Sequence, residues 1–242
     1  KGEDSLTTAH DRQQIEANAA GQFRFPAVIA TAAAILLYGF LPSDIQPLWL
    51  RVPVVAVSTL LLLSVSFVNP ARSSKGARLF RVASLTLAFM LVAANTLALS
   101  HTVVLLITTK PGDGVEILIA AAQVWATNVI AFSILMWELD RGGPVVRKQW
   151  DRHELPPADF RFPQDEDQDT SEEVAEQSAQ ASDWRPSFID YFYEAAVASM
   201  AFSPGAGVPV RPRAKLLLVF QSLQAFVLLA LVIAHAVGSL GS

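Results

Sequence analysis

The chain has 242 residues, of which 52% are hydrophobic, with a formal net charge of −4 at pH 7 and no cysteine. The lack of cysteine excludes disulfides and thiolate metal sites, and without a polybasic tail or a basic aromatic surface we expect no nucleic-acid partner. The apolar residues gather in runs close to the roughly 20 residues that a helix needs to cross a bilayer, so the sequence predicts an all-α integral membrane protein rather than a soluble enzyme.

The N-terminal half of the chain is predicted to hold most of the membrane helices. Residues 1–25 form a polar N-terminal segment in which we expect no cleavable signal peptide. A four-helix transmembrane region follows at 26–138. Its spans are predicted at about 26–41, 52–69, 80–108 and 115–138, and the tight turn Lys110–Gly114 makes the last two an antiparallel hairpin.

The C-terminal half begins with a polar acidic loop at 139–186. Within it, residues 156–183 hold nine acidic side chains and one arginine, a composition that cannot bury enough apolar area to form a core and that predicts flexibility. Residues 187–202 are apolar again but too short for a comfortable crossing, and the last span is predicted at 214–238. We therefore expect about five transmembrane helices plus a short re-entrant helix.

Basic residues in short loops predict the orientation. Four of them, with no acidic residue, lie in the hinge at 72–81 that leads into the third span: Arg72, Lys75, Arg78 and Arg81. This hinge, the N-terminus and residues 139–186 should therefore face the cytoplasm. The C-terminus lies outside if 187–202 re-enters without crossing and inside if it crosses, and the sequence leaves both open.

The residues before the last span indicate a pore loop. Ser187–Asp190 has the S-x-x-D form of a helix start, and Ser203–Gly207 is an irregular run of small residues. Non-helical backbone at membrane depth survives only where it is buried in protein or lines water. A short helix, extended backbone and a full span together are typical of a pore loop, so residues 187–242 are predicted to form a pore-like hairpin.

The stretch from Phe188 to Lys215 resembles the pore region of potassium channels. Four residues fall on matching positions: Tyr193, Pro209, Pro212 and Lys215. Where those channels read T-V-G-Y-G-D, this chain has Ala201-Phe202-Ser203-Pro204-Gly205-Ala206. The resemblance therefore implies a pore-like hairpin without the selectivity filter. Potassium channels also enter this loop from outside, whereas the basic residues here place it inside.

A second resemblance covers nearly the whole chain. Its motifs are Val124–Ile130 (VWATNVI), Trp137–Pro144 (WELDRGGP), Asp159–Gln164 (DFRFPQ), Trp184–Pro186 (WRP) and Ala201–Pro204 (AFSP). They resemble an uncharacterised family of bacterial multi-pass membrane proteins that usually reads T-A-F-S-P-T-D-T-x-P-L-T before the last span. This chain has Met200 for the first threonine and Gly205–Gly207 for T-D-T, so it lacks the groups most plausible as cation ligands. The resemblance implies an architecture and the bacterial cytoplasmic (inner) membrane, but no activity.

Acidic residues near the predicted pore are candidate functional groups. Asp190 and Glu194 lie four residues apart, on one helix face, and could form an acidic ring around a pore axis. Alternatively, Asp190 caps the helix and Glu194 pairs with Arg211 or Arg213. The full set of pore-lining candidates is Phe202, Ser203, Pro204, Gly205, Asp190 and Glu194.

Two further carboxylates, Glu138 and Asp140, are candidates for a vestibule that gathers cations. Alternatively, Trp137 is an interfacial anchor and both carboxylates lie in headgroup water. Polar residues within the spans are expected to make interhelical hydrogen bonds: Asn95, His101, Gln123, Thr127, Asn128, Gln221 and Gln224. His101 and His235 lack metal-ligand spacing, and no catalytic constellation, phosphate loop or H-E-x-x-H motif is present, so we expect no metal, no cofactor and no enzymatic activity.

These observations lead to one expected function and two alternatives. The first is a channel-like, weakly selective ion pore in the lipid bilayer, formed by a homo-oligomer around the 187–238 hairpin. The second is a non-conducting structural or accessory subunit of a larger membrane complex, which the missing filter favours. A small-solute transporter ranks lower, because the sequence has no visible inverted repeat or broken helix pair.

Overall fold

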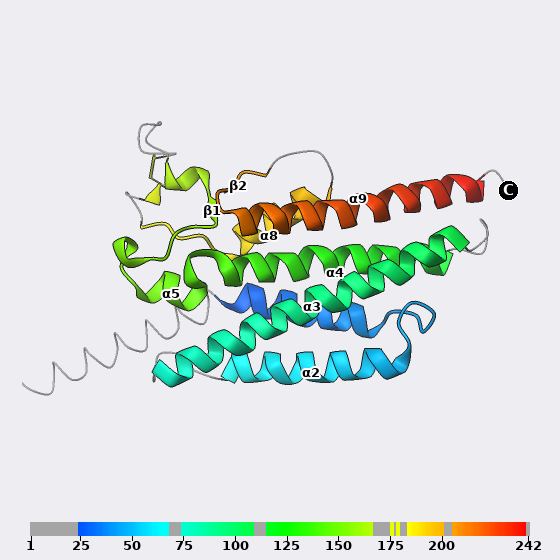
Figure 1. The fold of residues 1–242 in the computed structure, drawn as a ribbon, viewed down its shortest axis with the longest axis horizontal. Coiled ribbons are helices and arrows are strands. Elements are labelled where there is room, and N and C mark those ends of the chain that lie inside the picture. Colours follow the sequence, from blue (N-terminus) through cyan, green and yellow to red (C-terminus); the bar gives the residue numbers. More distant parts are fainter. Residues whose placement is uncertain are drawn as a thin grey trace, which may run out of the picture.

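The computed structural model describes residues 24–67, 74–108, 115–166, 175–176, 178–179, 183–200 and 205–240. Three features predicted from the sequence lie outside these ranges: nearly all of the N-terminal segment, the turn Lys110–Gly114 and the pore-lining candidates Phe202–Pro204. The described residues form a bundle of long helices with a polar end built from short elements (Figure 1).

The long elements account for most of the described chain. A helix at Arg24–Gly39 precedes α2 (Leu48–Phe67), α3 (Ser74–Thr108), α4 (Val115–Leu139) and α9 (Pro212–Leu240). The short helices are the 3₁₀ turns η2 (Asp140–Gly142), η3 (Arg152–Glu154) and η4 (Pro163–Asp165), together with α5 (Pro144–Gln149) and α8 (Phe188–Ser199). Two short strands, β1 (Phe160–Arg161) and β2 (Val208–Pro209), pair antiparallel with Phe160 opposite Pro209.

Four helical stretches are long and apolar enough to cross a membrane: Leu48–Ser66, Arg78–Thr108, Val115–Gly142 and Pro212–Gly238. The helix Arg24–Gly39 is apolar but shorter, about 24 Å at roughly 1.5 Å per residue against about 30 Å of hydrocarbon. Large apolar side chains such as Leu60 on α2 and Leu223 on α9 are exposed, as contact with lipid requires. The structure therefore indicates an all-α membrane protein with four candidate spans, where the sequence predicts about five.

Helix α4 lies at the centre of the bundle and packs against α3, α8 and α9 (Figure 1). Its side chains are almost continuously buried from Val129 to Glu138, with Phe132 and Met136 fully enclosed. Helix α2 packs on the other side of α3. Two clusters of buried apolar side chains fill the bundle, and α4 contributes to both.

Helix α8 runs along the second half of α4 in the opposite direction. At its start, the Phe188 ring lies 5.9 Å from the ring of Trp137. At its end, the indole N–H of Trp125 donates to the Ser199 carbonyl at 3.4 Å. The chain then returns to the polar end, because β2 pairs with β1 and α9 begins there (Figure 1).

Side-chain hydrogen bonds connect neighbouring helices in the interior of the bundle. Asn128 of α4 donates to Gln224 of α9 at 2.8 Å, and Gln224 donates to Thr96 of α3 at 3.1 Å. Gln221 of α9 donates to the Ser199 hydroxyl of α8 at 2.9 Å. The expected interhelical role is confirmed for the three amides Asn128, Gln221 and Gln224.

Candidate functional site

The polar end begins with a sharp turn after α4. Arg141, Gly142 and Gly143 all have positive φ, at 47°, 78° and 91°. A Cβ on Gly143 would lie 1.9 Å from Nη1 of Arg81 and 3.0 Å from the Glu138 carbonyl oxygen, so only glycine fits this position. The WELDRGGP motif is therefore a turn that folds the following residues back against the helix end, with Pro144 opening α5.

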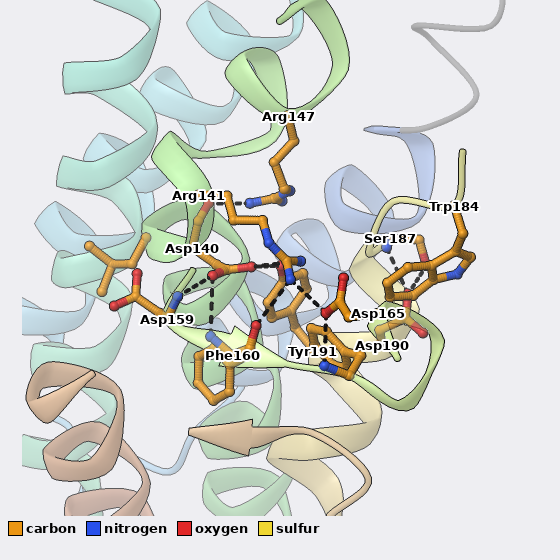
Figure 2. A network of polar contacts seen from close by, with 12 residues as sticks. Asp140, Arg141, Arg147, Asp159, Phe160, Asp165, Trp184, Ser187, Asp190 and Tyr191 are labelled. Atoms are coloured by element: carbon orange, nitrogen blue, oxygen red, sulfur yellow. Dashed lines mark hydrogen bonds and ion pairs between the residues drawn. The ribbon is translucent and has the colours of Figure 1, made fainter. Parts of the chain in front are cut away.

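Asp140 is the buried centre of this end of the molecule (Figure 2). Its Oδ2 accepts a 2.5 Å hydrogen bond from the Tyr191 hydroxyl of α8. Its Oδ1 accepts the backbone N–H groups of Asp159 at 2.6 Å and Phe160 at 3.3 Å. Burial raises the pKa of the Tyr191 phenol well above its usual value, so the hydroxyl stays protonated and remains a donor to the carboxylate.

A second carboxylate, Asp165, holds two arginines. Its Oδ2 lies 2.6 Å from Arg141 and its Oδ1 lies 2.8 Å from Arg152. Oδ2 also accepts the Phe162 backbone N–H at 3.0 Å. The five residues Asp140, Arg141, Asp159, Asp165 and Tyr191 are called the cap network below, because together they tie the ends of α4 and α8 to the connecting segment.

Asp159 extends the cap network to α9. Its carboxylate, 1% exposed, accepts two hydrogen bonds from the Arg213 guanidinium, at 2.6 and 2.5 Å. Its carbonyl oxygen accepts the backbone N–H of Val210 at 2.8 Å, next to the β1–β2 pair. The start of α9 is therefore fixed to the segment that follows α4.

The structure differs from the predicted acidic loop at Asp159–Phe162. Phe160 and Phe162 are buried, and their rings lie 6.0 and 5.4 Å from the Tyr191 ring. The two aromatic rings alternate with polar residues and so face the interior together. Flexibility of the more acidic residues after 166 stays a prediction.

The two vestibule candidates are both enclosed by protein. Glu138 is 2% exposed and Asp140 is 0% exposed. The Glu138 carboxylate accepts from Arg81 at 3.0 Å and from the Ser84 hydroxyl at 3.0 Å, and Arg81 also donates to the Glu138 carbonyl oxygen. Both carboxylates are therefore buried within the described chain, where each bonds to neighbouring elements.

The acidic pair of α8 also bonds within the chain. Asp190 accepts from the backbone N–H and the hydroxyl of Ser187, at 2.7 and 2.8 Å, so the helix start predicted at Ser187–Asp190 is confirmed. Glu194 is buried and accepts the backbone N–H of Gly207 at 2.5 Å, not an arginine as the sequence suggests. A Cβ on Gly205 would lie 2.0 Å from this carboxylate.

Burial raises the pKa of the Glu194 carboxyl, and the hydrogen bonds from the backbone of Gly207 and Ala206 oppose this rise. The carboxylate and the small residues around it therefore form one unit: the glycines leave room for the acid, and the acid holds the returning backbone. Of the pore-lining candidates, the structure brings Glu194 and Gly205 together, whereas Asp190 bonds to Ser187 at the start of α8.

Sequence reasoning misses Tyr191, Asp159 and Asp165 as members of the site, along with the buried Arg147. One signal is present in the sequence, because F-R-F within an acidic stretch has the two-residue period of a half-buried strand. The long-range partners carry no local signal. Comparisons with protein-family models, with curated proteins and with solved structures found no match.

Proposed function

We propose that the chain is a channel-like membrane protein in which α8 re-enters the membrane and the hairpin from α8 to α9 lines a weakly selective ion pathway. The path of the chain carries this proposal. Helix α8 has 12 residues, about 18 Å at roughly 1.5 Å per residue, which is about half of a bilayer. It starts beside Trp137, ends beside Trp125, and the chain then comes back before α9 begins.

The bonding of Glu194 supports a positioning role in this pathway. An irregular segment at membrane depth needs partners for its backbone groups, and the buried carboxylate supplies one to Gly207. Ala206 between the two glycines is exposed. In this proposal Glu194 holds the returning backbone from behind, and the exposed Ala206 faces the ions.

A homo-oligomer would complete the pathway. Helix α8 exposes Ile189 and Tyr193, Met200 directly after it is exposed, and α9 exposes apolar side chains that include Phe220 and Phe226. A neighbouring copy is the proposed partner of these faces. The polar end would lie in the cytoplasm of the bacterial inner membrane, since basic residues gather there: Arg78, Arg81, Arg147, Lys148 and Arg152.

Particle imaging of the purified protein in nanodiscs, with cation flux into proteoliposomes, tests the proposal. We expect a cyclic ring whose 187–210 segments meet at the axis, and a flux. Ala206→Asp should then change the preference among cations, with Ala206→Asn as the uncharged control of the same shape. A monomer, or a dimer whose 187–210 segments face lipid, would refute it.

A second candidate function is a non-conducting structural or accessory subunit of a membrane complex. The observation that favours it is that both carboxylates of α8 bond within their own chain, which leaves neither free to attract ions. An accessory subunit should copurify with a different protein and give no flux in proteoliposomes. The same imaging and flux measurements therefore separate the two candidates.

A further inference from the structure

The polar end holds a cavity of about 550 Å³ beside the cap network, a size within the roughly 300–1,000 Å³ of small-molecule sites. Its walls come from the residues after α4, from the segment before β1 and from Trp184–Pro186. The charged residues of its lining are strongly biased to one sign: Arg141, Arg147, Arg152, Arg161, Arg185 and Asp165.

Most of these arginines have a carboxylate partner. Asp165 is shared by Arg141 and Arg152. Two more pair with acids that do not line the cavity: Arg161 with Glu166 and Arg185 with Asp183, both at 3.0 Å. Four of the five arginines that line the cavity are therefore already paired with carboxylates.

Arg147 is the exception. Its side chain is fully buried, and only Nη1 has a hydrogen-bond partner, the Asp140 carbonyl oxygen at 2.5 Å. Among the described residues Nε and Nη2 have none, and no carboxylate lies within ion-pair distance of the guanidinium. The guanidinium lies over the rings of Tyr191 and Trp137, at 5.2 and 6.0 Å. A buried guanidinium with unpaired donors is costly unless an anion completes it.

We propose that this cavity binds the phosphoryl group of a phosphate ester, with Arg147 as its buried anchor. Guanidinium groups bind phosphate oxygens through paired N–H donors, and Nε with Nη2 of Arg147 is such a pair. Because both atoms are enclosed, binding in this proposal requires the lining side chains over them to move aside. The cavity is larger than an inorganic ion, which leaves room for the alcohol part of the ester. This inference is independent of the pore proposal.

The position of the cavity allows two sources for this group. Arg141 lies at the end of the candidate span Val115–Gly142 and Arg147 follows it in α5, so the headgroup of a phospholipid could reach them from the membrane. A soluble phosphorylated metabolite could arrive from the aqueous side. Pro186, just before α8, and Val210, just before α9, also line the cavity, so a bound ester would touch the chain where each helix of the hairpin begins.

Thermal unfolding of the full chain, purified in detergent, gives the first test, because a ligand that binds the folded state raises the unfolding temperature in a saturable way. The probes are inorganic phosphate and glycerol 3-phosphate, with chloride at equal ionic strength. Arg147→Gln removes the anchor. Since that variant could unfold, Ala158→Glu is the second: Ala158 lines the cavity, and a glutamate there would occupy the arginines. Ala158→Gln is its uncharged control.

We expect the phosphates to raise the unfolding temperature in a saturable way and by more than chloride does. The phosphate concentration at half of the maximal effect should be about tenfold higher or more in Arg147→Gln and Ala158→Glu, equivalent to about 1.4 kcal/mol. It should be unchanged in Ala158→Gln. Nanodiscs of phosphatidylcholine with and without phosphatidate identify the source. A response to soluble phosphate in phosphatidylcholine alone assigns a metabolite, and stabilisation by phosphatidate without a response to soluble phosphate assigns a lipid. The proposal is overturned if neither the soluble phosphates nor phosphatidate stabilise the protein more than chloride does, or if Ala158→Glu and Ala158→Gln respond equally.

Discussion

Replacing Tyr191 by phenylalanine removes a single oxygen atom from the cap network and leaves the rest of the side chain in place. The ring contacts to Phe160 and Phe162 and the contact with the Arg147 guanidinium all involve the ring and remain. What is lost is the 2.5 Å hydrogen bond to Asp140, between two side chains that are both fully buried.

The expected loss of stability depends on the hydrogen bonds that Asp140 retains in the variant. A hydrogen bond to a charged group contributes about 1.5–3 kcal/mol. Asp140 still accepts hydrogen bonds from the backbone N–H groups of Asp159 and Phe160, so its buried charge keeps partners. We therefore expect a destabilisation in the lower part of that range, about 2 kcal/mol. For a chain of this length, that corresponds to a fall of about 4–8 °C in the unfolding temperature.

The assay is thermal unfolding of the purified protein in detergent, followed by the loss of its monodisperse peak. Tyr193→Phe is the matched control, because Tyr193 lies on the same helix but is 53% exposed, and it should change stability by less than about 0.5 kcal/mol. If the two variants unfold at the same temperature, the hydrogen bond between Tyr191 and Asp140 does not hold the polar end together, and the reasoning fails.

Three further predictions concern the turn, the returning segment and the orientation. Gly143→Ala should destabilise the fold by about 3 kcal/mol, because the methyl group displaces Arg81 and the backbone strain alone costs roughly 1–3 kcal/mol. Gly39→Ala is the control: its Cβ would meet Val55 at an ordinary 3.5 Å, so it should leave the unfolding temperature unchanged in the same assay. Because the pKa of Glu194 is raised, its contribution to stability is present at acidic pH and is lost as pH rises through the folded-state pKa. The unfolding temperature of Glu194→Gln should therefore depend less on pH than that of the unmodified protein. If the two temperatures change with pH in parallel, the raised pKa of Glu194 is wrong. Because the chain has no native cysteine, single cysteines at the exposed Glu154 and Asp44 should react with an impermeant maleimide from opposite sides of intact cells, with Asp44→Cys labelled from outside; the reverse pattern would invert the orientation.

The sequence is sufficient to find the long helices, because apolar runs of spanning length have few other uses. It is also sufficient for the start of α8, since Ser187 and Asp190 are three residues apart and cap the helix locally. The span count differs at Arg24–Gly39, where a helix that hydropathy counts as a span is shorter than the others.

The polar end could not be predicted from sequence, because its contacts join residues far apart in the chain. Tyr191 and Asp140 are 51 residues apart, and Arg213 and Asp159 are 54 apart. The acidic composition of 156–183 also hides the buried Asp159–Phe162 stretch, because averaging over a window dilutes two phenylalanines among many charges. The partner of Glu194 could not be predicted either, because it is a backbone N–H, a group that every residue except proline carries.

The pairing of Asp159 with Arg213 also bears on the order in which the protein is made. The ribosome releases the residues around β1 before it releases α9. Until Arg213 emerges, the Asp159 carboxylate has no cationic partner among the described residues, and enclosing an unpaired charge is costly. We therefore expect the segment after α4 to stay unpacked and open to water until α9 has been made. Membrane insertion of α9 and closure of the polar end become one event, and a nascent chain that stops short of residue 212 should stay accessible to proteases there.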